Sequence, residues 1–435
     1  MIGKKILFIG CSILMTLLTT QAQVNENKQE KLSLSLAQAK EYAISYNRKI
    51  QTSNLAIQKA NQAKWQALSS MLPHVNASAG YTNFLGYEMA LDLGGGSAMD
   101  RVTALVDTLY KTHGITMPAS STSSSSASKI PMNPYGDFTA QATIGISGVQ
   151  VVATQLSKTA IAMSETNKSI SELDVKANVV NTYYSVLIAE ESKRIIEKSK
   201  ENVTKLYEST NNLYKVGMAE QTDVDLLSVQ LGIIENSIRF SERNIELAYN
   251  SMRLILGSDS AEIELTQTLD DFIGQNEPFT TIVSPFVVEQ NYNVQLLNQN
   301  IELSKKQVSM RKWEYGPTLS AFYQYTTKTY FGKSEGFNMT PPNTVGATLS
   351  IPIFSSGERL SKVRQAKFDL QTAELNKEDA IEGLLVQEKQ LRFNLKSAIE
   401  TYQVQKKNVE LYEHIFEKTS EKYRLGTISS TELTT

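Results

Sequence analysis

The sequence predicts an α+β fold in which long helices alternate with short β-hairpins, and three observations lead to it. First, two proline-free stretches have equal length: Gly217 lies 69 positions after Gly148, and Gly426 lies 69 positions after Gly357. Second, short segments alternate apolar and polar residues, as β-strands do. Third, residues 1–22 have the pattern of a secretory signal peptide.

Each proline-free stretch should form one long helix, because proline is the residue that most strongly interrupts a helix. At 1.5 Å per residue, such a helix runs roughly 100 Å, which exceeds an ordinary globular domain. Gly217 and Gly426 mark the points where each helix should reverse, since glycine accepts the left-handed backbone of a helix cap. Residues 218–256 are expected to form the return helix of the first reversal.

Identical residues at fixed offsets indicate an internal duplication. The offset is 209 positions along the long stretches and 244 positions upstream, with pairs such as Lys158/Lys367, Glu165/Glu374, Tyr214/Tyr423, Pro73/Pro317 and Tyr81/Tyr325. Each repeat reads as a helix, a proline, a strand, a loop, a strand, a long helix and Tyr-x-x-Gly. We assign residues 23–257 to the first repeat, 258–284 to a linker and 285–435 to the second repeat, which looks truncated at its C-terminal end.

The remaining elements follow from local pattern. Residues 34–72 have helical spacing and stop before Pro73. Four segments alternate in the manner of strands: 74–83, 138–147, 318–327 and 343–353. Residues 84–137, inside the hairpin over 74–147, contain three consecutive glycines and a Ser/Thr-rich run, which predicts a surface loop.

The alternating segments have the length of tilted transmembrane strands, about 9–11 residues. Aromatic residues such as Tyr81, Phe138, Tyr325 and Tyr330 fit a girdle at the membrane interface. The strand pattern alone fits two hairpins of a soluble sandwich equally well, and the signal peptide and the duplication favour the membrane. Four strands cannot close a barrel, so a membrane form requires several copies; three copies would supply twelve strands.

The N-terminal residues indicate export. Lys4 and Lys5 precede an apolar run, and cleavage after residue 22 takes the formal net charge from −2 to −4. An uncleaved membrane anchor and a lipidated Cys11 are the alternatives. A mildly acidic chain gives no electrostatic case for nucleic-acid binding.

Sequence motifs of catalysis are missing. The three histidines, His74, His113 and His414, fall in different predicted elements, and no zinc motif, Cys/His cluster or nucleophile elbow is present. We therefore expect no enzyme, no cofactor and no metal site.

The signal peptide, the helix–hairpin–long-helix repeat and the two Tyr-x-x-Gly reversals together resemble the TolC family of outer-membrane efflux proteins over essentially the whole mature chain. The resemblance implies a homotrimer with a twelve-stranded transmembrane β-barrel in the bacterial outer membrane and a long α-helical tunnel across the periplasm. It implies the exit duct of a tripartite efflux pump or type I secretion system, with a periplasmic adaptor (membrane fusion) protein and an inner-membrane transporter as partners. The exported substrate does not follow from it.

The resemblance also implies roles for residues at the reversals. The adaptor-contact candidates are Tyr214, Val216, Gly217, Met218, Tyr423, Leu425, Gly426 and Thr427. The periplasmic gate candidates are Glu432, Asp223 and Asp225, where carboxylates of several copies would ring a pore. A solvated first helical turn explains the same acids without any gate.

Two other functions fit parts of the pattern. A periplasmic or surface coiled-coil structural protein would need only the long helices. A secreted binding module would use residues 84–137 as its ligand surface.

Overall fold

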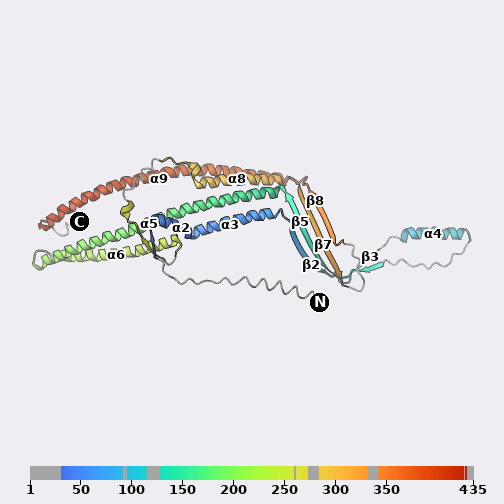
Figure 1. Cartoon of the computed structure of the whole chain (residues 1–435), viewed down its shortest axis with the longest axis horizontal. Helices are drawn as coiled ribbons and strands as arrows, with labels where there is room; N and C mark the ends of the chain where they lie inside the picture. Colours follow the sequence, from blue (N-terminus) through green and yellow to red (C-terminus); the bar gives the residue numbers. More distant parts are fainter. Residues whose placement is uncertain are drawn as a thin grey trace. The chain divides into compact units, whose positions relative to one another are not determined.

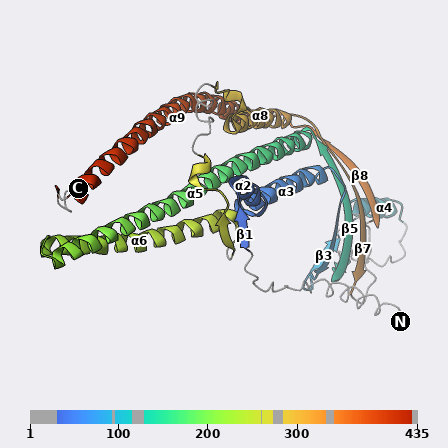
Figure 2. The same ribbon diagram turned by 60° about the vertical axis from the view of Figure 1, so that its left-hand side comes forward.

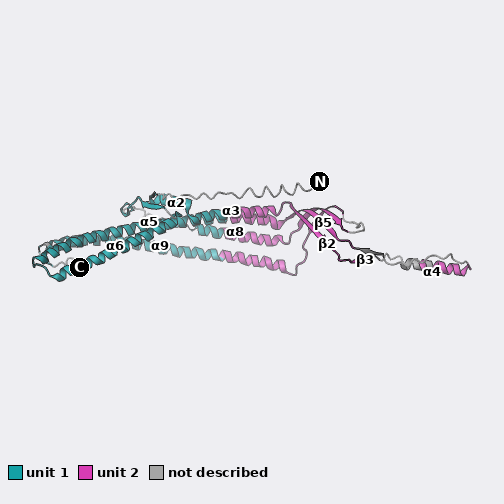
Figure 3. Ribbon diagram, turned by 90° about the horizontal axis from the view of Figure 1, so that it is seen from below, with its two compact units in different colours: residues 1–58, 162–298, 375–435 teal, residues 59–161, 299–374 magenta. Residues whose placement is uncertain are grey.

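A computed structural model describes residues 31–91, 96–114, 128–258, 261–272, 284–331, 341–425 and 427–428. The signal peptide, Cys11, Gly426 and Glu432 lie outside these residues. The chain divides into two compact units, shown in two colours in Figure 3. Unit 1 comprises Met1–Gln58, Ala162–Asn298 and Leu375–Thr435, and unit 2 comprises Lys59–Ile161 and Gln299–Glu374. No helix within the described ranges is both long and apolar enough to cross a membrane.

Unit 2 holds an antiparallel sheet of four strands in the order β2-β5-β7-β8 (Figure 1). Its strands are β2 (His74–Thr82), β5 (Tyr135–Ser147), β7 (Thr318–Tyr330) and β8 (Asn343–Ser350). All four predicted strands are confirmed, and β5 and β7 are longer than expected at 13 residues each. The two hairpins join through β5 and β7, which pair from Tyr135↔Tyr330 to Ser147↔Thr318.

The prediction of an unstructured surface loop over 84–137 was wrong. This segment contains β3 (Glu88–Leu91) paired with β4 (Ser128–Pro131), and α4 (Gly96–Thr112) between them. Residues 97–112 contain no glycine or proline, and Val102, Leu105 and Leu109 have helical spacing. The glycine-rich and serine-rich residues on either side indicated a loop for the whole segment, although residues 97–112 alone have a helical pattern.

Four helices contain residues of both units. They are α3 (Arg48–Ser69), α5 (Gly148–Lys215), α8 (Tyr292–Trp313) and α9 (Glu358–Arg424). α5 and α9 contain 68 and 67 residues without interruption, as the absence of proline predicted. The order helix, strand, strand, long helix thus occurs twice along the chain, the first time with β3, α4 and β4 inserted between the two strands.

Unit 1 begins with a feature that the sequence reading missed. The helix expected over 34–72 is preceded by β1 (Lys31–Leu34) and is divided into α2 (Leu36–Tyr46) and α3. Ser35 starts α2 with a reciprocal capping box, and Asn47 ends it in an extended conformation. The Asn47 amide donates to the carbonyl of Ile255 at 2.6 Å, which holds the break in place. Apolar periodicity alone gives no signal for such a break.

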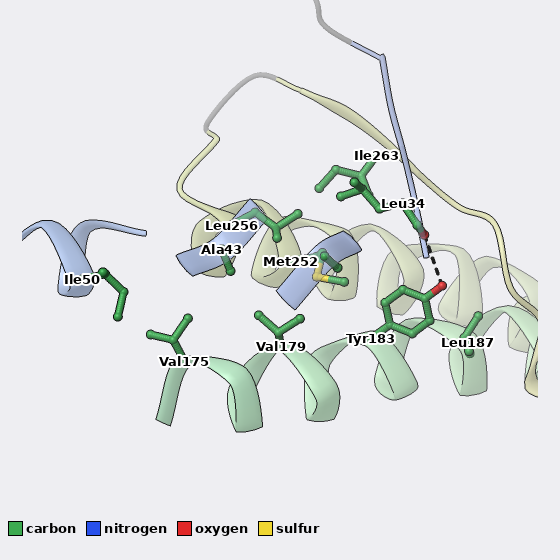
Figure 4. Close-up of a cluster of buried hydrophobic side chains, with 11 residues drawn as sticks. Leu34, Ala43, Ile50, Val175, Val179, Tyr183, Leu187, Met252, Leu256 and Ile263 are labelled. Atoms are coloured by element: carbon green, nitrogen blue, oxygen red, sulfur yellow. Dashed lines mark hydrogen bonds between the residues drawn. The ribbon is translucent and has the colours of Figure 1, made fainter. Parts of the chain in front are cut away.

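The expected linker also contains a strand. β6 (Glu262–Leu265) pairs in parallel with β1, so residues far apart in the sequence form a small two-stranded sheet. This sheet, α2, α5 and the end of α6 (Gln221–Leu256) enclose the main core of unit 1 (Figure 4). Tyr183 is fully buried there, and its hydroxyl donates to the carbonyl of Leu34 at 3.2 Å.

α5 and α6 lie side by side as an antiparallel hairpin within unit 1 (Figure 2). Three polar contacts join the two helices. Glu190 accepts a hydrogen bond from the Tyr249 hydroxyl at 2.6 Å, and the ion pairs Lys193–Glu242 and Lys200–Glu235 have distances of 3.1 and 2.9 Å. The return helix predicted after Gly217 is therefore confirmed.

Candidate functional site

The first helix reversal is built by Gly217. Its φ of +79° is left-handed, and the Gly217 amide donates to the carbonyl of Tyr214 at 2.9 Å. The Met218 amide donates to the carbonyl of Leu213 at 2.8 Å, so the last carbonyls of α5 are satisfied as in a glycine-terminated helix. The sequence prediction of a left-handed cap at Gly217 is confirmed.

Apolar side chains at the reversals face solvent. Val216 is 69% exposed, Met218 is 77% exposed and Tyr214 is 40% exposed. Leu425, at the end of α9, is 73% exposed. Three of these four exposed apolar side chains lie at the first reversal and the fourth lies at the end of α9.

The end of α9 contacts α5 through a hydroxyl pair. The Tyr423 and Thr210 hydroxyl oxygens lie 3.2 Å apart, and Thr210 is only 2% exposed. Thr427 closes the last turn, since its amide and hydroxyl both donate to the carbonyl of Lys422, at 3.1 and 2.9 Å. Sequence reasoning singled out Tyr423 and Thr427 but missed Thr210, because one threonine among many on a long helix gives no signal.

The acidic candidates of the first repeat lie at the start of α6. Asp223 is half-buried in the first turn, and Asp225 is exposed and accepts a hydrogen bond from the Gln221 amide at 2.9 Å. Between them, Val224 is buried at 5% exposure and faces the hairpin interior. Acids in a first turn are favoured by the helix dipole, so their position alone does not distinguish a gate from an ordinary helix start.

Charge pairing stabilises the α5–α6 hairpin along its length. The hydrogen bond from Lys200 lowers the pKa of Glu235, and the hydrogen bond to Glu242 raises the pKa of Lys193. Burial and then the bond to Glu190 raise the pKa of the Tyr249 hydroxyl. Tyr249 therefore stays protonated as the donor in the physiological range. Among the residues described, no group of three or more His, Cys, Asp or Glu is placed to hold a metal ion.

The four-stranded sheet has one apolar and one polar face. Register aligns Val75, Ala142, Tyr323 and Val345 in one row of the apolar face, which continues with Ala77, Ala79, Tyr81, Phe138, Ala140, Ile144, Ile146, Leu319, Ala321, Tyr325, Ala347 and Leu349. The adjacent row on the opposite face is Asn76, Gln141, Gln324 and Thr344. Val75 is 73% exposed and Val345 is 80% exposed, so the apolar face is not covered by unit 2 itself.

The aromatic residues predicted to form a girdle divide between the two faces of the sheet. Tyr81 packs on Phe331 with ring centroids 6.0 Å apart, and Phe138 and Tyr325 share its apolar face. Tyr330, by contrast, alternates onto the polar face, where its ring lies 5.7 Å from that of Tyr135. Tyr330 is five positions after Tyr325, an odd number, so alternation along one strand places the two residues on opposite faces.

The fold combines long helices with a four-stranded antiparallel sheet that has one apolar and one polar face. Residues 287–435 match the family described as outer membrane efflux protein. No curated protein sequence matches the chain. Solved structures match most of it: CusC at 13% identity and TM-score 0.67, covering 94% of this chain and 88% of that one. The CmeC outer membrane channel of Campylobacter jejuni matches at 16% identity and TM-score 0.64, covering 94% and 83%.

The outer membrane protein VceC of Vibrio cholerae matches at 15% identity and TM-score 0.65, covering 92% of this chain and 87% of that one. At these identities the structural matches establish the fold, and the family match covers the second predicted repeat. The family match over residues 287–435 and the structural matches over most of the chain confirm the resemblance to the TolC family drawn from the sequence.

Proposed function

We propose that this chain is one protomer of an outer membrane channel that serves as the exit duct of a tripartite efflux pump or type I secretion system. The observation that carries the proposal is the sheet, whose exposed face is apolar and whose opposite face is polar. This alternation is typical of strands that separate lipid from a water-filled pore. The polar face then lines the pore, and the protein acts as a passive conduit without an enzymatic step.

The sheet is incomplete in one chain. β2 and β8 lie at its two edges, and an open edge is not tolerated in lipid. Cyclic symmetry closes it if β2 of one copy pairs with β8 of the next, and three copies give twelve strands. The homotrimer is therefore the smallest assembly that encloses a channel rather than only side chains.

An exposed heptad stripe on α6 supports assembly independently. Every seventh residue is apolar and more than half exposed: Leu226 (57%), Ile233 (56%), Phe240 (59%), Leu247 (63%) and Leu254 (69%). A strict seven-residue spacing forms the seam of a coiled coil, which requires a partner helix. We assign that partner to a neighbouring copy, so that the long helices form the wall of a periplasmic tunnel.

The reversals are assigned to the periplasmic end, where the partners are a periplasmic adaptor protein and an inner-membrane transporter. Exposed Val216 and Met218 would enter an apolar groove of the adaptor, and Gly217 supplies the turn that presents them. The Thr210–Tyr423 contact would hold the second reversal against the first. Asp223, Asp225 and Glu432 remain candidates for an acidic ring at this end.

The domain assignment remains part of the proposal. Cleavage of residues 1–22 releases a chain of two repeats, 23–257 and 285–435, joined by a linker over 258–284. The structure argues against the coiled-coil rival, because that rival needs no alternating strands and the sheet contains four. The binding-module rival predicts that deletion of 84–137 abolishes activity, whereas a duct should still export.

A disulfide experiment tests closure directly. Ala77 on β2 and Ala347 on β8 share the apolar face, and two strands separate them within one chain. Three strand spacings amount to about 14 Å, beyond the roughly 7 Å limit for a disulfide, so a bond in A77C/A347C can form only between copies. Neighbouring positions Val345 and Leu349 serve as register alternatives to Ala347.

We expect oxidation of the double variant in outer membranes to give covalent dimers and trimers on denaturing gels, and A77C alone to give no such ladder. The wild-type protein should form heat-sensitive trimers in the outer-membrane fraction and conduct ions in planar bilayers. A soluble periplasmic monomer without conductance would refute the proposed function.

A further inference from the structure

The four strands of the sheet contain one acidic and one basic residue. The acid is Asp137 on β5 and the base is Lys328 on β7; β8 contains no titratable acid or base, and β2 contains only His74, which is counted as neutral at pH 7. These two residues are direct partners in the β5–β7 register. Among the 43 residues of these four strands, the two that carry a formal charge thus lie directly opposite each other.

Both side chains belong to the polar face. Asp137 alternates with Phe138 and is two positions from Thr139, whose hydroxyl lies 3.2 Å from that of Thr326 across the strands. The Lys328 ammonium lies over the ring of Tyr135, 5.1 Å from its centroid. Directly paired residues on one face of a sheet have Cβ atoms about 4.5–5.5 Å apart, so Asp137 and Lys328 start from adjacent positions.

The strand next to Asp137 leaves space for its carboxylate. Gly80 on β2 is the register partner of Asp137, and a Cβ atom at Gly80 would lie 2.8 Å from the Asp137 Oδ1. The carboxylate therefore rests on the surface of β2, and the ammonium rests on Tyr135. The rings of Phe84 and Tyr330 pack beside Tyr135, with centroids 6.1 and 5.7 Å from that of Tyr135.

The pair lies at the end of the sheet that is remote from the long helices. Asp137 is the third residue of β5, which continues into α5 after Ser147. Lys328 is third from the end of β7, whose first residue follows α8. If the helices cross the periplasm, this end of the sheet is the outer mouth of the pore.

We propose that Asp137 and Lys328 form a charge-compensated ring that sets the ion selectivity of the outlet. The inference rests on the proposed function, since it takes three copies around one pore. Three carboxylates and three ammonium groups then alternate at one level, and each acid cancels the field of its partner. Solutes of either sign meet little electrostatic barrier at this ring.

The effect of removing one partner is large enough to measure. A twelve-stranded barrel places these charges on the order of 10 Å from the pore axis. Three uncompensated unit charges at that distance, screened at 0.1 M salt, change the anion-to-cation permeability ratio about fivefold. At 1 M salt the Debye length falls to about 3 Å, and the effect should nearly vanish.

Reversal potentials of trimers in planar bilayers under a salt gradient test the inference. D137N should shift selectivity about fivefold toward anions and K328Q about fivefold toward cations. The exchanged variant D137K/K328D and the neutral variant D137N/K328Q should both return to the wild-type value. Neutralising Asp107 or Lys111, an exposed ion pair on α4 at 3.0 Å, is the matched control with the same change in net charge and should leave selectivity unchanged.

The outcomes separate the two claims. Wild-type protein without conductance would refute the channel function itself. Conducting variants in which D137N and K328Q leave the reversal potential unmoved, or move it in the same direction, would overturn the ring while leaving the channel intact. A pair that only fixed strand register would lower the thermal stability of both single variants without opposite shifts in selectivity.

Discussion

Three glycines of the α5–α6 hairpin give a graded prediction, because alanine meets a different environment at each. Gly217 and Gly257 both have left-handed backbones, with φ of +79° and +75°. A Cβ at Gly217 meets nothing within 4 Å, whereas a Cβ at Gly257 lies 2.6 Å from the carbonyl oxygen of Tyr46. Gly232 lies inside α6 and also has open space around it. The three sites therefore separate backbone strain from steric overlap.

The magnitudes follow from these environments. G217A forces alanine into a left-handed conformation and should lower the free energy of unfolding by about 1–2 kcal/mol. G257A adds overlap with the backbone of Tyr46, about 1–3 kcal/mol more. G232A replaces glycine within a helix and should raise stability by about 0.5–1 kcal/mol.

The unfolding temperature of each detergent-purified variant can be measured by the loss of the helical circular dichroism signal on heating. We expect it to decrease in the order G232A, wild type, G217A, G257A. G217A also reports on function, since it should weaken adaptor binding through a distorted reversal, whereas G232A should not. Equal losses for G217A and G257A would show that the Tyr46 contact contributes nothing. A loss for G232A would refute the assignment of an open helix interior at that position.

Further predictions concern side chains of unit 1. Y183F removes a hydroxyl that donates to a carbonyl of β1 and should cost about 1 kcal/mol by chemical denaturation, against about 3–5 kcal/mol for Y183A. Y423F should release the end of α9 from Thr210, seen as faster proteolysis there with unchanged cleavage at the first reversal. The hydrogen bond from Lys200 lowers the pKa of Glu235, so this contact stabilises the fold fully at pH values above the ordinary pKa of 4.5. The stabilisation is lost as the pH falls through the lowered pKa. K200Q should therefore reduce the loss of stability on acidification in a stability–pH profile.

Much of the architecture could be predicted because its signals are local. Absence of proline sets the extent of α5 and α9, and alternation locates β2, β5, β7 and β8. The left-handed turn at Gly217 follows from residue type alone. The break at Asn47 combines a local and a distant contact: its side-chain oxygen accepts from the Lys49 amide at 2.8 Å, and its side-chain amide donates to the carbonyl of Ile255 in α6, more than two hundred residues away. Only the local contact could have been read from the sequence.

The candidate site divides in the same way. The sequence located the first reversal, but it could not indicate that the Thr210 and Tyr423 hydroxyls lie close together, since that contact requires α5 and α9 to be adjacent. Asp137 and Lys328 are visible as isolated charges in alternating segments, yet only the register shows that they are opposite. A slip by one residue would place Lys328 on the apolar face, so burial of one face against lipid would itself select the observed register.

Stability and assembly are coupled in this fold. In one chain the heptad stripe of α6 and the apolar face of the sheet are both exposed, although each is large enough to favour burial. Burying one leucine or phenylalanine side chain completely contributes about 1.5–3 kcal/mol, so five such residues along one seam outweigh a single polar bond between α5 and α6. If the copies assemble as proposed, the long helices gain much of their stability from neighbouring copies, as expected for helices whose own apolar stripe is narrow. It follows that conditions which separate the copies should unfold the helical wall before they disrupt the small core around Tyr183.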